Sequence, residues 1–216
     1  MAVLEELKVK NVIISKQGED SQNLQEFKKI TNKKKIPTII VGSDVLDSTK
    51  KQSNSNIKMK DTVKIQIEKD IYFNFLWPKN PKMINENVLN NNSIVCKLNY
   101  KGFSCLFTGD IEQIAEKEIL EQYKNDLQIL NSTVLKVAHH GSKTSSTEGF
   151  LEAVKPKISL IGVGLNNTFG HPNDNVLKRL ESTGSKVYRT DKMGEVSITV
   201  NKNEKMKIKK FIENSD

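Results

Sequence analysis

The sequence predicts a mixed α/β domain, and three features of its patterning lead to that prediction. Hairpin-like strands come first, alternating strands and helices follow, and no internal repeat or linker divides the series. A hairpin sheet continued by alternating β and α segments is typical of layered α/β domains. With 216 residues, the chain is long enough for one sizeable core and too short for two comfortable domains. We therefore treat residues 1–216 as a single domain.

The N-terminal part is expected to form a strand, a helix and a second strand before a long polar loop. Val9–Ser15 and Ile36–Val41 are apolar runs of strand length, and apolar residues recur at helical spacing within Asn23–Lys35. Ser43–Lys60 is rich in Ser, Asn, Lys and Asp without an apolar period. That composition favours a loop.

Two hairpins follow. Thr62–Glu68 alternates apolar and polar residues, which indicates a half-buried strand, and Ile71–Trp77 is its expected partner. After the polar loop Lys79–Asn92, the segments Ser93–Tyr100 and Phe103–Thr108 form the second expected hairpin.

Beyond Gly109-Asp110 the pattern changes to alternating helices and strands. The expected helices are Ile111–Tyr123, one near Thr147–Val154, and Asp174–Ser182, and the expected strands are Thr133–Ala138, Lys157–Val163, Lys186–Thr190 and Glu195–Asn201.

Composition narrows the function only slightly. The net charge is +8 and the isoelectric point is about 9.3, which favours polyanionic partners such as nucleic acid or anionic lipid. The basic residues are nearly all scattered lysines among many asparagines, a pattern that biased genome composition also produces. No apolar run approaches the roughly 18 residues of a membrane span, and the acidic start Met1–Leu7 does not resemble a signal peptide. We therefore expect a soluble chain without membrane contact of its own, in a compartment that the sequence does not indicate.

Cys96 and Cys105 are expected to be buried thiols. If Lys101-Gly102 is a two-residue turn, Cys105 lies opposite Leu98 and Cys96 is its diagonal neighbour. Diagonal neighbours are roughly 7–8 Å apart, beyond usual disulfide reach. The same register gives the hairpin a uniformly apolar inner face: Ile94, Cys96, Leu98, Tyr100, Phe103, Cys105 and Phe107.

The residues that could carry chemistry follow apolar strands. Asp110 comes after Phe103–Thr108, His139 and His140 after Thr133–Ala138, and His171 after Lys157–Val163 and its loop. Ends of adjacent strands converge at one edge of a sheet, where open α/β sheets bind ligands. Imidazole and carboxylate are ligands of Zn²⁺ and Mn²⁺. The sequence therefore predicts that these four residues cluster.

Each feature has a structural alternative. Asp110 could cap the helix from Ile111, and a His-His pair is often a solvated loop. Ser142 and the Thr144–Thr147 run are most simply turn and capping residues, with phosphate contacts as the less common alternative.

A resemblance to a known family favours the functional interpretation. Leu135–Ser145, with its His-His-Gly-Ser core, closely resembles a signature of the ComEC-type competence proteins, whose metallo-β-lactamase-fold domains are attached to a membrane DNA channel. Further similar pieces occur in the family's order: Phe75-Leu76-Trp77-Pro78, Asn91-Asn92-Ser93, Phe107–Glu112, Gly162-Val163-Gly164, Asn166-Asn167, Gly170-His171-Pro172, and Tyr188-Arg189-Thr190-Asp191 before Gly194.

The resemblance implies a metallo-β-lactamase-like αββα sandwich and a metal-dependent hydrolase of the phosphodiesterase or nuclease type. Its cofactor would be Zn²⁺ or Mn²⁺. Asp110, His139, His140 and His171 become the candidate metal ligands, and which of His139 and His140 binds the ion stays open. His140 and His171 are also expected to act catalytically. The residues expected to bind substrate are Ser142, Lys143, Thr144, Ser145 and Asn167.

The chain departs from the family at its first metal motif, a histidine- and aspartate-rich element followed by Gly-Gly-Leu. No histidine precedes His139, so we expect an N-terminally truncated domain. A complete site would hold two ions, whereas this chain is expected to hold at most one, weakly. Its expected partners are DNA, bound weakly through lysines with steep salt dependence, and either the missing N-terminal half or a second copy.

Three hypotheses follow. The chain is part of a metal-dependent phosphodiesterase or nuclease of DNA uptake with little activity alone, a non-catalytic DNA-binding module, or an inactive remnant. The substrate stays open, since the fold hosts several chemistries.

Overall fold

The computed structural model describes residues 1–16, 21–42, 63–79 and 83–212, and its main feature is a seven-stranded mixed sheet. The strands lie side by side in chain order, from β3 to β9. Strands β3 to β6 pair antiparallel, and β6 to β9 pair parallel. Their bounds are β3 Val63–Glu68, β4 Ile71–Trp77, β5 Val95–Tyr100, β6 Phe103–Phe107, β7 Val134–Lys136, β8 Ile158–Ile161 and β9 Lys186–Arg189.

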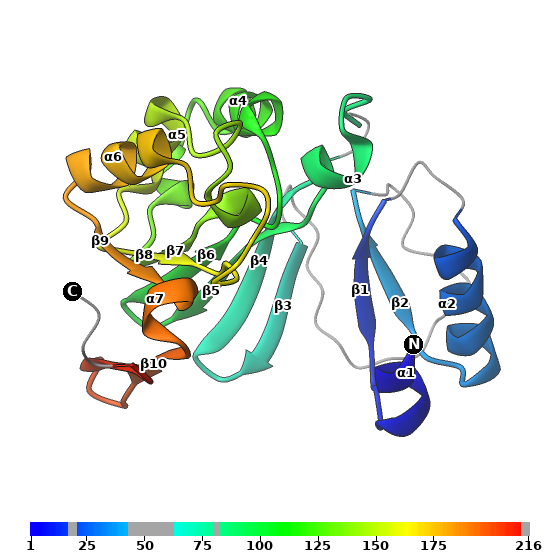
Figure 1. Cartoon of the computed structure of the whole chain (residues 1–216). Helices are drawn as coiled ribbons and strands as arrows, with labels where there is room; N and C mark the ends of the chain where they lie inside the picture. Colours follow the sequence, from blue (N-terminus) through cyan, green and yellow to red (C-terminus); the bar gives the residue numbers. More distant parts are fainter. Residues whose placement is uncertain (17–20, 43–62, 80–82, 213–216) are drawn as a thin grey trace.

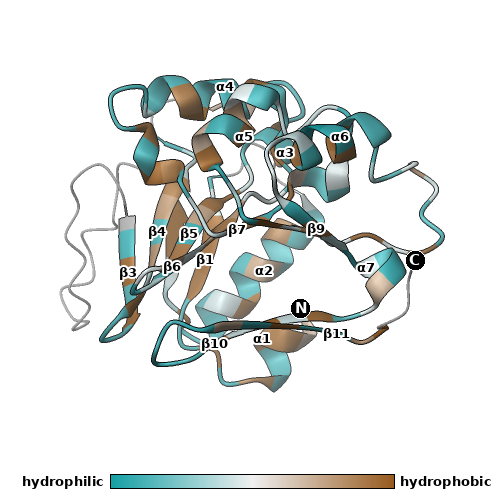
Figure 2. Cartoon of the chain, turned by 90° about the vertical axis from the view of Figure 1, so that its left-hand side faces the viewer, coloured by the Kyte–Doolittle hydropathy of each residue, from teal (hydrophilic) through white to brown (hydrophobic). Residues whose placement is uncertain are grey.

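Three helices cover one face of this sheet: α4 (Gln113–Gln122), α5 (Glu148–Val154) and α6 (Asp174–Ser182) (Figure 1). They act as the crossovers that parallel strands require. The main core lies between the helices and the sheet, and its fully buried members include Leu106, Leu135 and Leu180. Figure 2 shows the central strands as largely hydrophobic and the helices as mixed, as expected for helices with one buried side.

A two-stranded hairpin packs on the opposite face. It consists of β10 (Val196–Val200) and β11 (Met206–Lys210). Ile198 and Ile208 pair across the hairpin and pack with Cys105, Val134 and Ile158 of the sheet. The sequence-based prediction ended at β10 and was wrong there: lysines occupy three of the five positions of β11, so only its pairing with β10 reveals it as a strand.

The N-terminal residues form a small βαβ unit beside the β3 end of the large sheet (Figure 1). Helix α1 (Ala2–Glu6) precedes β1 (Val12–Ser15), α2 (Gln22–Lys33) and β2 (Thr38–Val41), and β1 and β2 pair parallel. Gly42, just after β2, lies against Pro78, since a Cβ at Gly42 would lie 3.0 Å from the Pro78 Cγ.

The structure confirms the mixed α/β class and most expected elements. Helix α6 has the predicted bounds, while several strands are one to three residues shorter than predicted. The stretch 79–92 was predicted to be loop throughout, but it contains a short helix, α3 (Val88–Asn91). Another short helix, α7 (Thr190–Met193), follows β9. The predicted loop Ser43–Lys60 lies outside the described residues.

Among the described helices, none is both long and apolar enough to cross a membrane.

The predicted register of the second hairpin is confirmed. Leu98 pairs with Cys105, and Cys96 pairs with Phe107. Both cysteines are free, with Cys105 buried and Cys96 half-buried, so the expectation of full burial was wrong for Cys96. Burial raises the pKa of Cys96 to about 11, and burial together with the neighbouring Cys96 raises the pKa of Cys105 to about 12.

We predict that both thiols react slowly with a soluble disulfide reagent in the folded chain at mildly alkaline pH. The reactive species is the thiolate, which is scarce when the pKa is this high. Two thiols should titrate rapidly once the chain is denatured in guanidinium. Equal labelling rates in the folded and denatured chain would contradict this description.

Candidate metal and catalytic site

Three loops meet at the carboxyl ends of β6, β7 and β8. Asp110 lies in the first, His139 and His140 in the second, and His171 in the third. The backbone N–H of His139 donates to the Gly109 carbonyl at 3.1 Å, and that of Asn173 donates to the Gly141 carbonyl at 2.9 Å. The parallel strands therefore bring together all four predicted ligand residues.

Two glycines permit this close approach. Gly141 has φ +81°, and a Cβ there would lie 2.6 Å from the Pro172 Cβ. Gly109 has φ +54°, and a Cβ there would lie 2.6 Å from the Ser93 Cβ. Since real Cβ atoms do not pack this closely, any larger residue would push the loops apart.

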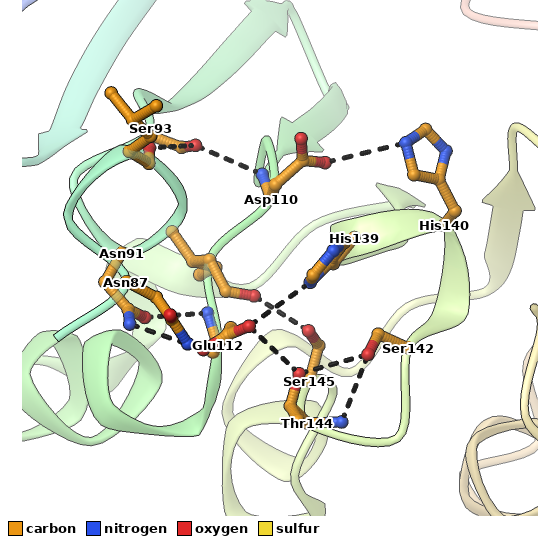
Figure 3. Close-up of polar contacts among 12 residues, drawn as sticks. Asn87, Asn91, Ser93, Asp110, Glu112, His139, His140, Ser142, Thr144 and Ser145 are labelled. Carbon is orange, nitrogen blue, oxygen red and sulfur yellow. Dashed lines mark hydrogen bonds and ion pairs between the residues drawn. The ribbon is translucent and has the colours of Figure 1, made fainter. Parts of the chain in front are cut away.

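Asp110 and His140 face each other across the site (Figure 3). The Asp110 Oδ1 and the His140 Nε2 are 3.9 Å apart, and both side chains are about half exposed. The His140 Nδ1 hydrogen-bonds to the Gly162 carbonyl. A carbonyl only accepts, so Nδ1 carries a proton, and in the neutral ring the lone pair belongs to Nε2, which faces Asp110.

The backbone sends the two adjacent histidines in different directions. His139 and His140 have φ of 46° and 55°, in the left-handed region that costs about 1–2 kcal/mol per residue. As a result His140 faces Asp110, while His139 faces the buried Glu112 (Figure 3). Strained backbone of this kind is common at functional sites.

Glu112 is the residue that sequence reasoning missed. It is the N-cap of α4, so the alternative of Asp110 as the cap of a helix from Ile111 was wrong. Its carboxylate accepts hydrogen bonds from Asn87 at 2.8 Å and Thr144 at 3.3 Å. The His139 Nδ1 is buried without a hydrogen bond, although the Glu112 Oε1 lies 3.5 Å away. The pair is therefore an electrostatic contact without hydrogen-bond geometry.

His171 completes a row of rings. Its ring centroid is 5.7 Å from that of His139, and the His139 and His140 centroids are 6.4 Å apart. Burial, followed by the nearby His139 and His140, lowers the pKa of His171 from its ordinary value of 6.5.

Lys136 is a second site residue that the sequence analysis did not identify. It ends β7, and its Nζ donates to the Val137 carbonyl at 2.8 Å. Burial lowers its pKa from 10.5, and the charge of Asp110 partly opposes that shift. The one feature of the sequence that could have identified Lys136 as a site residue is its charge within the otherwise mostly apolar run Thr133–Ala138.

The predicted substrate-binding residues divide into two groups. Ser145 is buried, and its hydroxyl donates to the Ile111 carbonyl at 2.9 Å. The Ser142 and Thr144 hydroxyls contact each other at 3.1 Å, while Lys143 is exposed. Asn167 donates to the His171 carbonyl at 2.8 Å and accepts from the His171 N–H at 2.9 Å. In this structure Ser145 and Asn167 hold the loops, and Lys143 is free to meet a ligand.

The buried Glu116 and the half-buried Arg179 hold the Ser/Thr loop by hydrogen bonds to its backbone. The Glu116 carboxylate accepts from the backbone N–H groups of Ser146 and Thr147. The Arg179 guanidinium donates to the Ser145 and Ser146 carbonyls at 2.9 and 2.8 Å. Burial raises the pKa of Glu116, against the opposing effect of these hydrogen bonds and of Arg179.

The donors present suit one ion better than two. Two ligand atoms of one ion, each about 2.0–2.2 Å from it, are at most about 4.4 Å apart when they lie on opposite sides of it, and about 3.4 Å apart at a tetrahedral angle. The 3.9 Å between Asp110 and His140 meets that limit. Within residues 1–16, 21–42, 63–79 and 83–212, no three His, Cys, Asp or Glu side chains form a group that could hold an ion. His139 and Glu112, 3.5 Å apart, meet the same limit, so the described residues offer two facing pairs of donors and no group of three.

Three curated proteins are similar to this chain over part of its length. ComE operon protein 3 of Bacillus subtilis is 36% identical over 140 residues, which cover 65% of this chain and 17% of the relative. Competence protein ComA of Neisseria gonorrhoeae is 36% identical over 122 residues, 56% of this chain and 17% of the relative. Recombination protein 2 of Haemophilus influenzae is 32% identical over 128 residues, 59% of this chain and 15% of the relative.

The chain is a homologue of competence proteins. The matched stretch is less than a fifth of the length of each relative. No family model matches the chain.

We predict that Glu112→Gln destabilises the folded chain by about 1–3 kcal/mol. The amide would turn an N–H toward Asn87 or Thr144, which leaves a buried donor unsatisfied. Urea unfolding measures the effect, with Glu152→Gln on the exposed side of α5 as the matched control. A Glu112→Gln variant as stable as the control would remove Glu112 from this network.

Proposed function

We propose that this chain provides part of a metal-dependent phosphodiesterase or nuclease site of a DNA-uptake protein, within a metallo-β-lactamase-type sandwich. The observation that carries the proposal is the facing pair of Asp110 and His140, 3.9 Å apart. The Gly162 carbonyl holds the His140 ring so that Nε2 is directed into the site. A histidine whose other nitrogen donates to a backbone carbonyl is the usual form of a metal ligand.

The similarity to competence proteins supports DNA as the substrate. Two of the relatives are named for competence or its operon, and a third for recombination. The excess of lysine, with net charge +8, suits a phosphodiester backbone. A mixed sheet with helices on one face and a hairpin on the other is compatible with one half of a four-layer sandwich.

The residues of this chain would each have a different role at this site. A bound divalent ion would supply an activated water and polarise a phosphoryl oxygen. Asp110 and His140 would bind that ion. Lys143 would neutralise phosphate charge from the exposed loop, and His171 would accept a proton at the edge of the site. Glu112, 3.5 Å from the His139 Nδ1, would help to keep the His139 ring in place.

Calorimetric titration with Mn²⁺ or Zn²⁺ tests the proposal. We expect one weakly bound ion, because the described residues form no group of three donors, and a loss of affinity of about tenfold or more in Asp110→Ala. Asp191→Ala is the matched control, since Asp191 pairs with Arg189 outside the site. Hydrolysis of bis-p-nitrophenyl phosphate should be no more than trace. Metal binding that is unchanged in Asp110→Ala would overturn the proposal. Rapid hydrolysis of bis-p-nitrophenyl phosphate by this chain would contradict the expectation that it binds its ion only weakly.

A further inference from the structure

The loop that leads to His171 carries two exposed apolar side chains. Leu165 is 76% exposed and Phe169 is 80% exposed. A Cβ added at Gly164 or Gly170 would meet no atom within 4 Å. The loop therefore stands away from the rest of the described chain, and the Phe169 ring is accessible to a ligand.

Phe169 has a defined orientation at the edge of the site. Its ring stacks on the His171 imidazole, with centroids 6.0 Å apart and planes 19° apart. Asn167 fixes the loop on both sides of the His171 peptide and donates to the Gly164 carbonyl at 3.2 Å. The phenyl ring is therefore the direct neighbour of the His171 ring, which is in turn the neighbour of the His139 ring.

We propose that Phe169 is a stacking platform for one unpaired nucleobase of a single-stranded nucleic acid whose phosphate lies at the Asp110–His140 pair. This inference rests on the proposed function, and it names the residue that would make the site prefer single-stranded over double-stranded nucleic acid. Aromatic rings stack any base, whereas the bases of a duplex are already stacked and paired. The exposed Lys143 on the neighbouring loop provides the positive charge that a phosphate beside the base requires.

A protein partner would use Phe169 differently. An apolar protein contact would need no cation beside it, whereas Lys143 is exposed on the neighbouring loop and the chain as a whole has a net charge of +8, which favours a polyanionic partner. A second copy of this chain would bring the same positive charge to the contact.

The test measures fluorescence anisotropy of a labelled oligothymidine in the presence of the divalent ion used in the calorimetric titration, since this chain is expected to cleave only in trace. Phe169→Ala should bind roughly 5- to 150-fold more weakly, the range expected for one lost base–aromatic stack. The salt dependence should be unchanged, because stacking releases no counterions. Phe169→Tyr should restore binding. Phe211→Ala is the matched control, since Phe211 is 83% exposed outside these loops.

An oligonucleotide of abasic residues separates stacking from loop damage. The unaltered chain and Phe169→Ala should bind it equally. The proposal is overturned if Phe169→Ala matches Phe211→Ala on oligothymidine, if it weakens abasic binding as strongly, or if the unaltered chain does not bind single strands. A change in sedimentation alone would assign Phe169 to a protein contact. Because bis-p-nitrophenyl phosphate carries no base, Asp110-dependent metal binding and hydrolysis fail or succeed independently of this result.

Discussion

The candidate site depends on the parallel pairing of β6, β7 and β8. Parallel strands end at the same edge, so residues separated by about 30 positions in sequence become neighbours in space. The contact of Gly141 with Pro172 and the hydrogen bond from His139 to Gly109 then fix the distance between the loops. A substitution that separated these loops would remove the Asp110–His140 pair without touching either side chain.

Two buried carboxyl groups hold this edge together through hydrogen bonds. Glu112 and Glu116 are both buried, and each accepts hydrogen bonds from the segment 144–147. Burying a carboxyl group is unfavourable unless it is well hydrogen-bonded. The Ser/Thr run supplies those hydrogen bonds. Thr144, Ser146 and Thr147 therefore have structural hydrogen bonds to these carboxyl groups, whereas Lys143 is the exposed member of the predicted substrate-binding set on this loop.

The sequence predicted the scaffold better than the roles of the residues on it. Helix α6 was predicted with correct bounds because its apolar residues recur at helical spacing, and Val176 and Leu180 are indeed buried. Strand β11 was missed because its lysines hide a short apolar alternation. The clustering of Asp110 with the histidines followed from strand order alone.

Finer features could not be predicted because they depend on backbone torsion and on contacts distant in sequence. Nothing in a His-His pair indicates that His140 faces Asp110 while His139 faces Glu112, since that follows from two consecutive left-handed residues. Glu112 appears in the sequence as an ordinary helix start, and its contacts with Asn87 and Thr144 exist only in the folded chain.

The central claim is that His140 presents its Nε2 to an ion shared with Asp110. Long-range ¹H–¹⁵N NMR of the histidine rings during a Zn²⁺ titration tests it directly. The account predicts that the His140 Nε2 resonance shifts on metal addition while Nδ1 stays protonated, and that Asp110→Ala weakens the response. A shift at the His140 Nδ1, or a titration that Asp110→Ala leaves unchanged, would contradict it.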